Sequence, residues 1–339
     1  MIGWLLNLDD DSRRRSLNQA SLASGITPKA IEKDWWVTLV LKMLFTSRYR
    51  RYFTFKGGTS LSKGWGIIDR FSEDIDIALN SEAFGKAYIE KPSKTYVEQL
   101  RRVGCAFVSN EIAEELKALF VLFQIPESYY LIEVEVVRTD MPDKDPQALY
   151  INYKSLYDPN PYLPDRVKIE FSVRSQNEPN DTRKIKTLLS FYFPNDVYDE
   201  QDFSVSAIQP ARTLIEKILL LHEEYNQKDE DKMRTFRMSR HYYDLHRIFQ
   251  FADYSKVLAD IKFIEHIIEH RKSYTRLKQF DYGTLRIGQI SIIPSETILS
   301  ALQYDFDEMT KEMIYGSSPT FAEIISTARK IQEAFNQRS

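Results

Sequence analysis

The sequence predicts an α+β protein in which strands and helices alternate first and helices alone follow. Short runs of alternating apolar and polar residues, typical of half-buried strands, occur before about residue 205. From Pro210 onward, apolar residues recur three and four positions apart, which is typical of helices. We therefore predict two domains, at residues 1–205 and 206–339.

The composition is that of an ordinary globular protein. Of 339 residues, 43% are apolar and 28% are charged, and the formal net charge is −3. This net charge excludes a protein that is basic over its whole surface, and a single cysteine excludes an intramolecular disulfide or a Cys-rich zinc site. No run approaches the roughly 18–20 apolar residues of a membrane span, and the N-terminus lacks a signal-peptide pattern. We expect a soluble, cytoplasmic protein without a membrane partner.

A helix is predicted to begin at Thr27 and Pro28, because threonine is a good N-cap and proline suits the first helical position. Apolar residues follow at helical spacing: Ile31, Trp35, Leu39, Val40, Met43 and Leu44. Lys33 and Asp34 are expected on the polar side of this helix.

The next segment is predicted to be a strand, a glycine turn, a short helix and a second strand. The first strand covers residues 52–55 and ends at Lys56-Gly57-Gly58. The short helix begins at Thr59, and the second strand covers residues 74–79, where acidic and apolar residues alternate at the start.

Further elements are predicted from periodicity alone. Helices are expected at residues 95–103, 111–123, 210–221, 238–251, 254–273 and 320–337. Strands are expected at residues 130–137, 167–173 and 187–193.

Two acidic residues at the start of the second strand are candidate metal ligands. Asp74 and Asp76 are two positions apart, so in a strand both side chains point to the same face, roughly 7 Å apart along the chain. Mg²⁺ is a hard cation that prefers carboxylate oxygens, and transfer of a phosphoryl-type group needs such an ion. The other interpretation is a solvent-facing acidic strand.

The glycine turn is a candidate phosphate-binding segment. Gly57 and Gly58 lack a Cβ atom, so the backbone can approach a phosphate closely, and the following helix start offers free N–H groups. Thr59 and Ser60 add hydroxyls at the same place. Either motif alone is common, but their order, with only a short helix between them, favours a nucleotide site.

The third carboxylate of such a site is predicted to be Glu170, on the alternating strand 167–173. Lys168 lies on the same face of that strand, so a simple Glu170–Lys168 pair is the alternative. Glu133 and Glu135 compete for the same role from strand 130–137.

Residues that flank these motifs are also candidates for the nucleotide site. Lys56 and Lys63 flank the glycine turn, and either could neutralise phosphate; Lys56 is favoured, and the alternative for both is an ordinary surface lysine. Ser72 precedes the acidic strand and either binds phosphate, orients Asp74 or caps a turn.

Together, these segments closely resemble the AbiEii/AbiGii toxin-type nucleotidyltransferases of the polymerase-beta-like superfamily. Residues 31–36 are also similar to the helix that precedes that family's core. The resemblance implies a mixed β-sheet catalytic domain with flanking helices, a helical C-terminal domain, a nucleoside triphosphate substrate and Mg²⁺ (or Mn²⁺). The motifs that carry it are Lys56-Gly57-Gly58-Thr59-Ser60-Leu61-Ser62-Lys63 and Arg70-Phe71-Ser72-Glu73-Asp74-Ile75-Asp76-Ile77.

Two later segments extend the resemblance. Residues 211–221 are similar to the family's lysine-bearing helix, which implies that Lys217 contacts the triphosphate. Residues 240–245 are similar to its Arg-Asp-x-x-Asp-Leu helix, which implies that Asp244 acts near the reacting centre. His241 departs from this pattern, because the family usually carries an aspartate there.

The resemblance implies an enzyme that transfers a nucleoside monophosphate from a triphosphate to an acceptor hydroxyl. The acceptor is expected to be RNA, of a kind similar to transfer RNA, and the enzyme to be the toxin of a toxin–antitoxin or phage-defence system with a separate antitoxin protein. One alternative is a nucleotidyltransferase that modifies a protein or a small molecule. Another is a nucleotide-binding interaction protein without catalysis, which the presence of Asp74, Asp76 and the glycine turn argues against.

Overall fold

A computed structural model of the chain describes residues 1–137, 144–160, 163–193, 202–251 and 254–337. The chain forms two compact units. Unit 1 contains residues 1–66, 71–88 and 93–208, and unit 2 contains residues 67–70, 89–92 and 209–339. The boundary predicted between residues 205 and 206 falls within strand β7 (Phe203–Ile208), and the long continuous part of unit 2 begins at Gln209.

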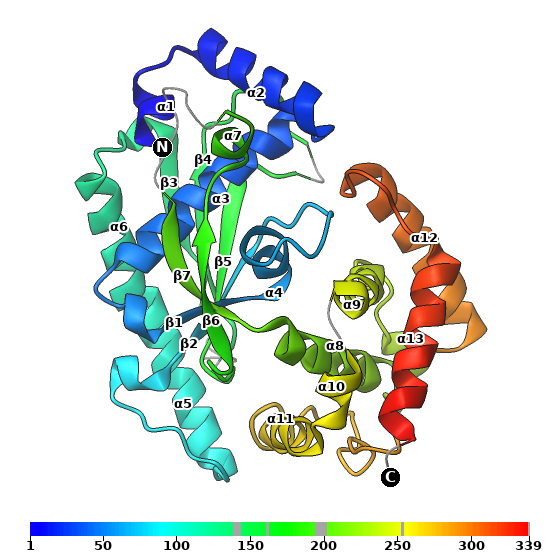
Figure 1. Cartoon of the computed structure of the whole chain (residues 1–339). Coiled ribbons are helices and arrows are strands. Elements are labelled where there is room, and N and C mark those ends of the chain that lie inside the picture. The colour runs from blue at the N-terminus through cyan, green and yellow to red at the C-terminus, as the bar shows by residue number, and fades with distance from the viewer. Residues whose placement is uncertain (138–143, 161–162, 194–201, 252–253, 338–339) are drawn as a thin grey trace. The chain divides into compact units, whose positions relative to one another are not determined.

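Unit 1 is built on a mixed sheet (Figure 1), which confirms the predicted α+β fold. Within the described residues the strand order is β3-β4-β5-β2-β1-β7-β6. The pairs β2–β5 and β1–β7 are parallel and the other pairs are antiparallel. The remaining strands are β1 (Phe53–Lys56), β2 (Ile75–Leu79), β3 (Tyr130–Val134), β4 (Gln147–Tyr153), β5 (Arg166–Ser172) and β6 (Asn180–Ile185).

Helices of unit 1 flank this sheet. The Thr27 side chain accepts a hydrogen bond from the Ala30 N–H and caps α3, as predicted. No helix of the described residues is long and apolar enough to cross a membrane. The helices are α1 (Ile2–Leu6), α2 (Asp10–Ser24), α3 (Pro28–Thr46), α4 (Gly57–Thr59), α5 (Lys94–Phe107), α6 (Ala113–Leu122) and α7 (Leu188–Tyr192), with shorter helical turns η1 (Arg50–Tyr52), η2 (Ser60–Gly64), η3 (Ser81–Phe84), η4 (Val108–Ile112) and η5 (Glu127–Tyr129).

The predicted strand at residues 187–193 is wrong, because this segment forms helix α7. The Thr187 side chain accepts a hydrogen bond from the Ser190 N–H at 3.0 Å and thereby starts a helix. The periodicity of a short apolar run does not distinguish a strand from a buried helix. Here the cap formed by Thr187 favours the helix.

The two faces of the sheet differ in chemistry. Side chains of Ile75, Ile77 and Phe171 are fully buried on one face, where α3 contacts β5 and β7. Because side chains alternate along a strand, Asp76 and Glu170 project from the other face. The apolar face therefore fixes the sheet, and the polar face carries the candidate carboxylates.

Lys33 and Asp34 were expected on the polar side of α3, but neither side chain faces solvent. Both are buried, at 2% and 6% exposure, because α3 is covered on nearly all sides. Lys33 forms an ion pair with Glu73, and Asp34 forms an ion pair with Lys63. Glu73 directly precedes Asp74, and Lys63 lies in η2, which follows the glycine turn. Two successive residues of one helix therefore hold both motif segments.

Unit 2 is mainly helical, and non-helical segments connect its helices. Helix α9 buries Tyr242, Leu245 and Ile248 and contacts α8, α12 and α13. The single helix predicted at residues 254–273 is instead two helices, because the Asp260 side chain caps a new start by accepting from the Phe263 N–H. The helices are α8 (Pro210–Tyr225), α9 (Ser239–Phe251), α10 (Tyr254–Ala259), α11 (Ile261–Tyr274), α12 (Glu296–Glu312) and α13 (Phe321–Asn336), with η6 (Glu230–Lys232).

We predict that replacing Lys33 destabilises unit 1 strongly. The variant Lys33→Met leaves the Glu73 carboxylate buried without its cation, which costs about 3–5 kcal/mol of the free energy of unfolding. Urea unfolding followed by circular dichroism measures this cost. A double variant, Lys33→Met with Glu73→Met, should recover most of it, because an apolar pair carries no unpaired charge.

The matched control is Lys117→Met in α6. Lys117 also forms an ion pair, with Glu114, but its side chain is 52% exposed. Exposed pairs contribute about 0–1 kcal/mol, so this variant should unfold almost like the wild type. Equal losses for Lys33→Met and Lys117→Met would show that the buried pair does not stabilise the unit.

Candidate functional site

The glycine turn lies directly against one of the two candidate metal ligands. Gly57 has a φ of +76°, a conformation that side-chain-bearing residues rarely adopt. A Cβ atom built on Gly57 would lie 2.0 Å from Oδ2 of Asp76, so any side chain there would collide with the carboxylate. The pairing of β1 with β2 explains this approach, because Lys56 is opposite Asp76. The turn and the carboxylate are therefore neighbours in space.

A second contact joins the turn to the strand entry. The Thr59 hydroxyl donates a hydrogen bond to the Asp74 carbonyl and is hydrogen-bonded to the Ser72 hydroxyl at 2.9 Å. Thr59 and Ser60 are both fully buried. Among the described residues, the Ser60 hydroxyl has no hydrogen-bond partner. These two hydroxyls were expected to face phosphate, but the structure places them inside the fold, where Thr59 holds Asp74 in position.

The carboxylates of Asp74, Asp76 and Glu170 are brought to one region by strand pairing. Asp74 immediately precedes β2 and Asp76 lies within it, and both side chains are partly exposed. Strands β2 and β5 are parallel, with Asp76 directly beside Glu170. Neighbouring strands are about 4.8 Å apart, so the two residues are adjacent on the same face.

Glu133 and Glu135, the alternative third carboxylates, lie elsewhere on the sheet. Strands β4 and β5 separate β3 from β2, and Glu133 is opposite Tyr150 of β4. Glu135 forms an ion pair with Lys144. Of these candidates, only Glu170 is in register with Asp76.

Two lysines are held near the carboxylates. Lys168 Nζ contacts Glu170 Oε1 at 2.7 Å, the pair that the sequence left as an alternative. Burial alone would lower the pKa of Lys168, but the hydrogen bond that Lys168 donates to Glu170 and the charges of Glu170 and Asp74 outweigh it and raise that pKa. Lys168 is therefore cationic at neutral pH. Lys56 Nζ donates to the Ser175 hydroxyl at 2.7 Å.

The chemistry of these donors fits a hard divalent cation. Mg²⁺ is usually bound by one or two carboxylates, and water and substrate phosphates complete its coordination. Asp74 and Asp76 supply two partly exposed carboxylates beside the glycine turn, where a triphosphate would meet them. Within the described part of the chain, no three His, Cys, Asp or Glu side chains are gathered closely enough to hold a metal without substrate. The donors therefore fit a hard divalent cation whose coordination is completed when substrate binds.

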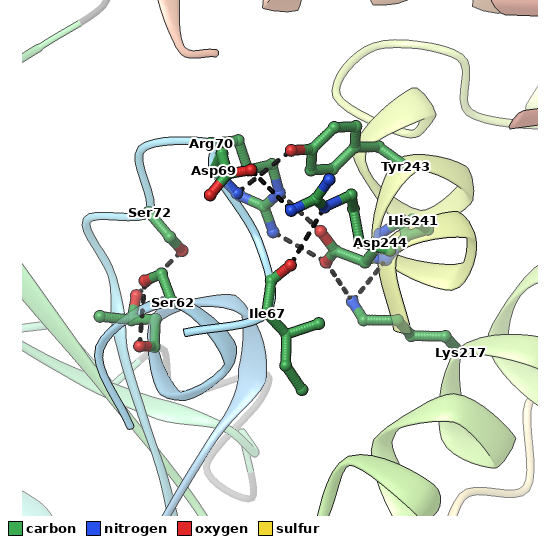
Figure 2. A network of polar contacts seen from close by, with 11 residues as sticks. Ser62, Ile67, Asp69, Arg70, Ser72, Lys217, His241, Tyr243 and Asp244 are labelled. Atoms are coloured by element: carbon green, nitrogen blue, oxygen red, sulfur yellow. Dashed lines mark hydrogen bonds and ion pairs between the residues drawn. The ribbon is translucent and has the colours of Figure 1, made fainter. Parts of the chain in front are cut away.

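Unit 2 contains its own buried polar network, centred on Asp244 of α9 (Figure 2). The Asp244 carboxylate, which is fully buried, accepts hydrogen bonds from Arg70 Nε at 2.7 Å and Arg70 Nη2 at 2.8 Å. Lys217 Nζ of α8 lies 2.9 Å from the same carboxylate and 3.3 Å from Nδ1 of His241. Lys217 and Asp244, to which the family resemblance gives separate roles, are therefore in direct contact.

The protonation states in this network follow from burial and charge. Burial would raise the pKa of Asp244, but Arg70 and Lys217 outweigh it and hold that pKa well below its ordinary value. Burial lowers the pKa of Lys217, against the opposing effect of Asp244. Burial, Lys217 and Arg240 together hold the pKa of His241 well below its ordinary value. A neutral His241 therefore accepts the second hydrogen bond of Lys217, at the position where the family pattern carries an acid.

The segment just before the acidic strand is also fixed by α9. Arg247 forms an ion pair with Asp69 at 2.6 Å and donates to the Ile67 carbonyl, and the Tyr243 hydroxyl accepts from the Asp69 N–H at 3.2 Å. Sequence reasoning missed Arg70 and Arg247, because each is separated from its partner by more than 170 residues. No periodicity or local motif reports a contact over such a distance.

A protein-family model matches residues 39–336 of the chain. The family is described as the nucleotidyl transferase AbiEii toxin of a type IV toxin–antitoxin system. No curated protein matches the chain. The match contains the glycine turn and the acidic strand, whereas residues 31–36, the start of the resemblance in α3, lie outside it. Because the match covers most of the sequence, the chain belongs to the AbiEii nucleotidyltransferase toxin family.

Proposed function

We propose that this nucleotidyltransferase transfers a nucleoside monophosphate from a nucleoside triphosphate to a hydroxyl of an RNA similar to transfer RNA. The observation that supports this most strongly is the contact of Gly57 with Asp76, because it joins a phosphate-binding turn to a metal-binding carboxylate. Toxins of this kind act together with an antitoxin, so a separate protein that restrains the enzyme is the expected partner.

The donor half of the reaction uses the turn and the acidic strand. Backbone N–H groups at Gly57 and Gly58, together with Lys56, hold the triphosphate. Asp74 and Asp76 hold Mg²⁺ (or Mn²⁺), which when bound neutralises the charge that develops on the transferred phosphate. Ser72 acts through Thr59, to which it is hydrogen-bonded, and thereby orients Asp74.

The transfer exchanges one bond at the α-phosphorus for another. The acceptor oxygen bonds to the α-phosphorus while the bond from that phosphorus to the α,β-bridging oxygen breaks, and pyrophosphate leaves with the electron pair. Glu170 accepts the proton of the attacking hydroxyl, since it lies beside Asp76 on the same face of the sheet. Glu170 also serves as a third metal ligand in this proposal.

Lys217 supplies a positive charge to the triphosphate, as the family resemblance implies. Asp244 is fully buried and bonded to both Arg70 and Lys217, so its proposed role is to position the Lys217 ammonium. Asp244 thus acts through Lys217 and not by contact with the reacting atoms.

The decisive experiment uses each α-³²P-labelled nucleoside triphosphate with Mg²⁺ and total cellular RNA. We expect label in an RNA band with the wild type and none with the Asp74→Ala/Asp76→Ala variant, because the variant loses both metal carboxylates. If the label enters protein or a small molecule instead of RNA, that molecule is the acceptor and RNA is not. No transfer at all by a protein that still binds the triphosphate would favour a non-catalytic nucleotide-binding role.

A single methyl group at Gly57 should abolish transfer. Gly57→Ala places a Cβ atom 2.0 Å from the Asp76 carboxylate, so turn and carboxylate must separate, and displacements of about 1 Å can cost roughly 100-fold in rate. The control is Gly25→Ala at the end of α2. Gly25 has almost the same φ, +75°, but no atom lies within 4 Å of its added Cβ.

Both alanine variants introduce backbone strain of about 1–2 kcal/mol, and Gly57→Ala also displaces the Asp76 carboxylate, so its unfolding free energy should fall by at least as much as that of Gly25→Ala. Only Gly57→Ala should lose NMP transfer, measured as initial rate with labelled triphosphate. Retained activity in Gly57→Ala would contradict the assignment of this turn to the nucleotide.

If Glu170 is the third carboxylate, a conservative substitution of this residue should slow the reaction strongly. Glu170→Gln removes the proton acceptor and should lower kcat by about 100- to 10,000-fold, with little change in the Kd of the triphosphate. Glu133→Gln, on β3, should leave kcat within about twofold of the wild type, because β4 and β5 separate its strand from β2. The opposite order of effects would move the role to Glu133.

A further inference from the structure

The sheet face that carries Asp76 and Glu170 continues on β5 and β4 into four polar side chains. Arg166, Lys168 and Glu170 alternate along β5, so all three point to the same face. Tyr150 of β4 is opposite Lys168, and Asn152 is opposite Arg166. We name Tyr150, Asn152, Arg166 and Lys168 the acceptor strip. By strand rise, its two cations lie roughly 7 and 13 Å along β5 from Glu170.

The chemistry of the acceptor strip is that of a surface for single-stranded RNA. The Arg166 guanidinium lies over the Tyr150 ring, 4.7 Å from its centroid, and Arg166 is exposed. Stacked arginine and tyrosine planes receive unpaired bases, and cations contact the backbone phosphates. The positive charges of Arg166 and Lys168 complement a polyanion.

An unsatisfied polar atom in the acceptor strip also indicates a ligand. The Asn152 amide nitrogen is buried and has no hydrogen-bond partner among the described residues. An unpaired buried donor is costly, so such donors are normally satisfied. A phosphate or base oxygen of a bound strand would accept this hydrogen bond.

The position of the strip relative to the donor site indicates which substrate it binds. The glycine turn follows β1, on one side of β2, and β5 lies on the other side of β2. In a transfer at phosphorus, the attacking oxygen and the leaving pyrophosphate are roughly in line on opposite sides. An acceptor therefore enters from the β5 side when the triphosphate lies at the turn.

We propose that the acceptor strip binds the end of the acceptor RNA strand and delivers its hydroxyl to Glu170. Arg166 and Lys168 contact phosphates, the Arg166–Tyr150 stack supports an unpaired base, and Asn152 donates to an oxygen of the strand. This inference rests on the proposed function and adds to it the surface that selects RNA.

The test compares Arg166→Ala and Tyr150→Ala with the control Arg51→Ala. Arg51 is also an exposed arginine stacked on a tyrosine, 4.6 Å from the Tyr52 ring centroid. It precedes β1, at the end of that strand opposite to Gly57. The two arginine variants thus remove the same charge and the same type of stack, at different places on the sheet.

With labelled triphosphate and total transfer RNA as the probe, the KM for RNA should rise about tenfold in Arg166→Ala and in Tyr150→Ala. Arg51→Ala should match the wild type. The slope of log KM against log salt should fall by about 0.7 in Arg166→Ala, because one phosphate contact to a single strand is lost, but not in Tyr150→Ala. The Kd of the triphosphate should be unchanged in all three variants, which shows that each is folded.

Two results would count against the strip. If the wild type modifies RNA and Arg166→Ala has the same KM and salt slope as Arg51→Ala, the strip is wrong while the proposed function stands. If the wild type labels protein and not RNA, the RNA acceptor in the proposed function fails, and this inference fails with it.

Discussion

The structure of unit 1 depends on two adjacent buried ion pairs on helix α3. Lys33 pairs with Glu73 and Asp34 pairs with Lys63, and every one of these side chains is nearly inaccessible to water. Removing one partner of such a pair leaves an uncompensated buried charge, so neither segment can move away from α3 cheaply. Since Glu73 adjoins Asp74 and Lys63 lies in η2, which follows the glycine turn, one helix determines the position of both the acidic strand and the glycine turn.

Shorter contacts then complete the alignment that α3 begins. Gly57 lies against the Asp76 carboxylate, and Thr59 holds the Asp74 carbonyl, so the turn and the strand are joined at residues 74 and 76. A site that is fixed before substrate binds spends less free energy on reorganisation during the reaction. The connection from η2 to Asp74 passes through residues 67–70, which belong to unit 2 and are held there by Asp244 and Arg247. The chain therefore leaves unit 2 at Arg70 and reaches Asp74 four residues later.

The sequence predicted features that depend on residues close together in the chain, but it did not predict contacts between residues far apart in the chain. The Thr27 cap, the glycine turn before a helix and the shared face of Asp74 and Asp76 depend on residues a few positions apart, and such patterns determine backbone geometry directly. Lys33 and Asp34 were predicted to face solvent because charged residues of a helix usually do. In the structure both are buried in ion pairs with residues that lie 40 and 29 positions away in the sequence. Arg70 carried no signal, because only the tertiary fold brings Asp244 to it. The hydroxyl of Thr59 looked like a phosphate ligand for the same reason, since its acceptor on residue 74 is visible only in the folded chain.

Strand register explains why Glu170, and no other acid of the neighbouring strands, lies beside Asp76. A slip of one residue between β2 and β5 would turn Glu170 to the apolar face and expose Ile169 or Phe171 instead. Burying a side chain of this size contributes about 1.5–3 kcal/mol, so Ile169 and Phe171 together make that slip costly. The apolar residues between the acids thus align the carboxylates, although they touch no substrate. The same register places Lys168 and Arg166 on the polar face, so the core that selects the third carboxylate also creates the surface on which an acceptor strand would lie.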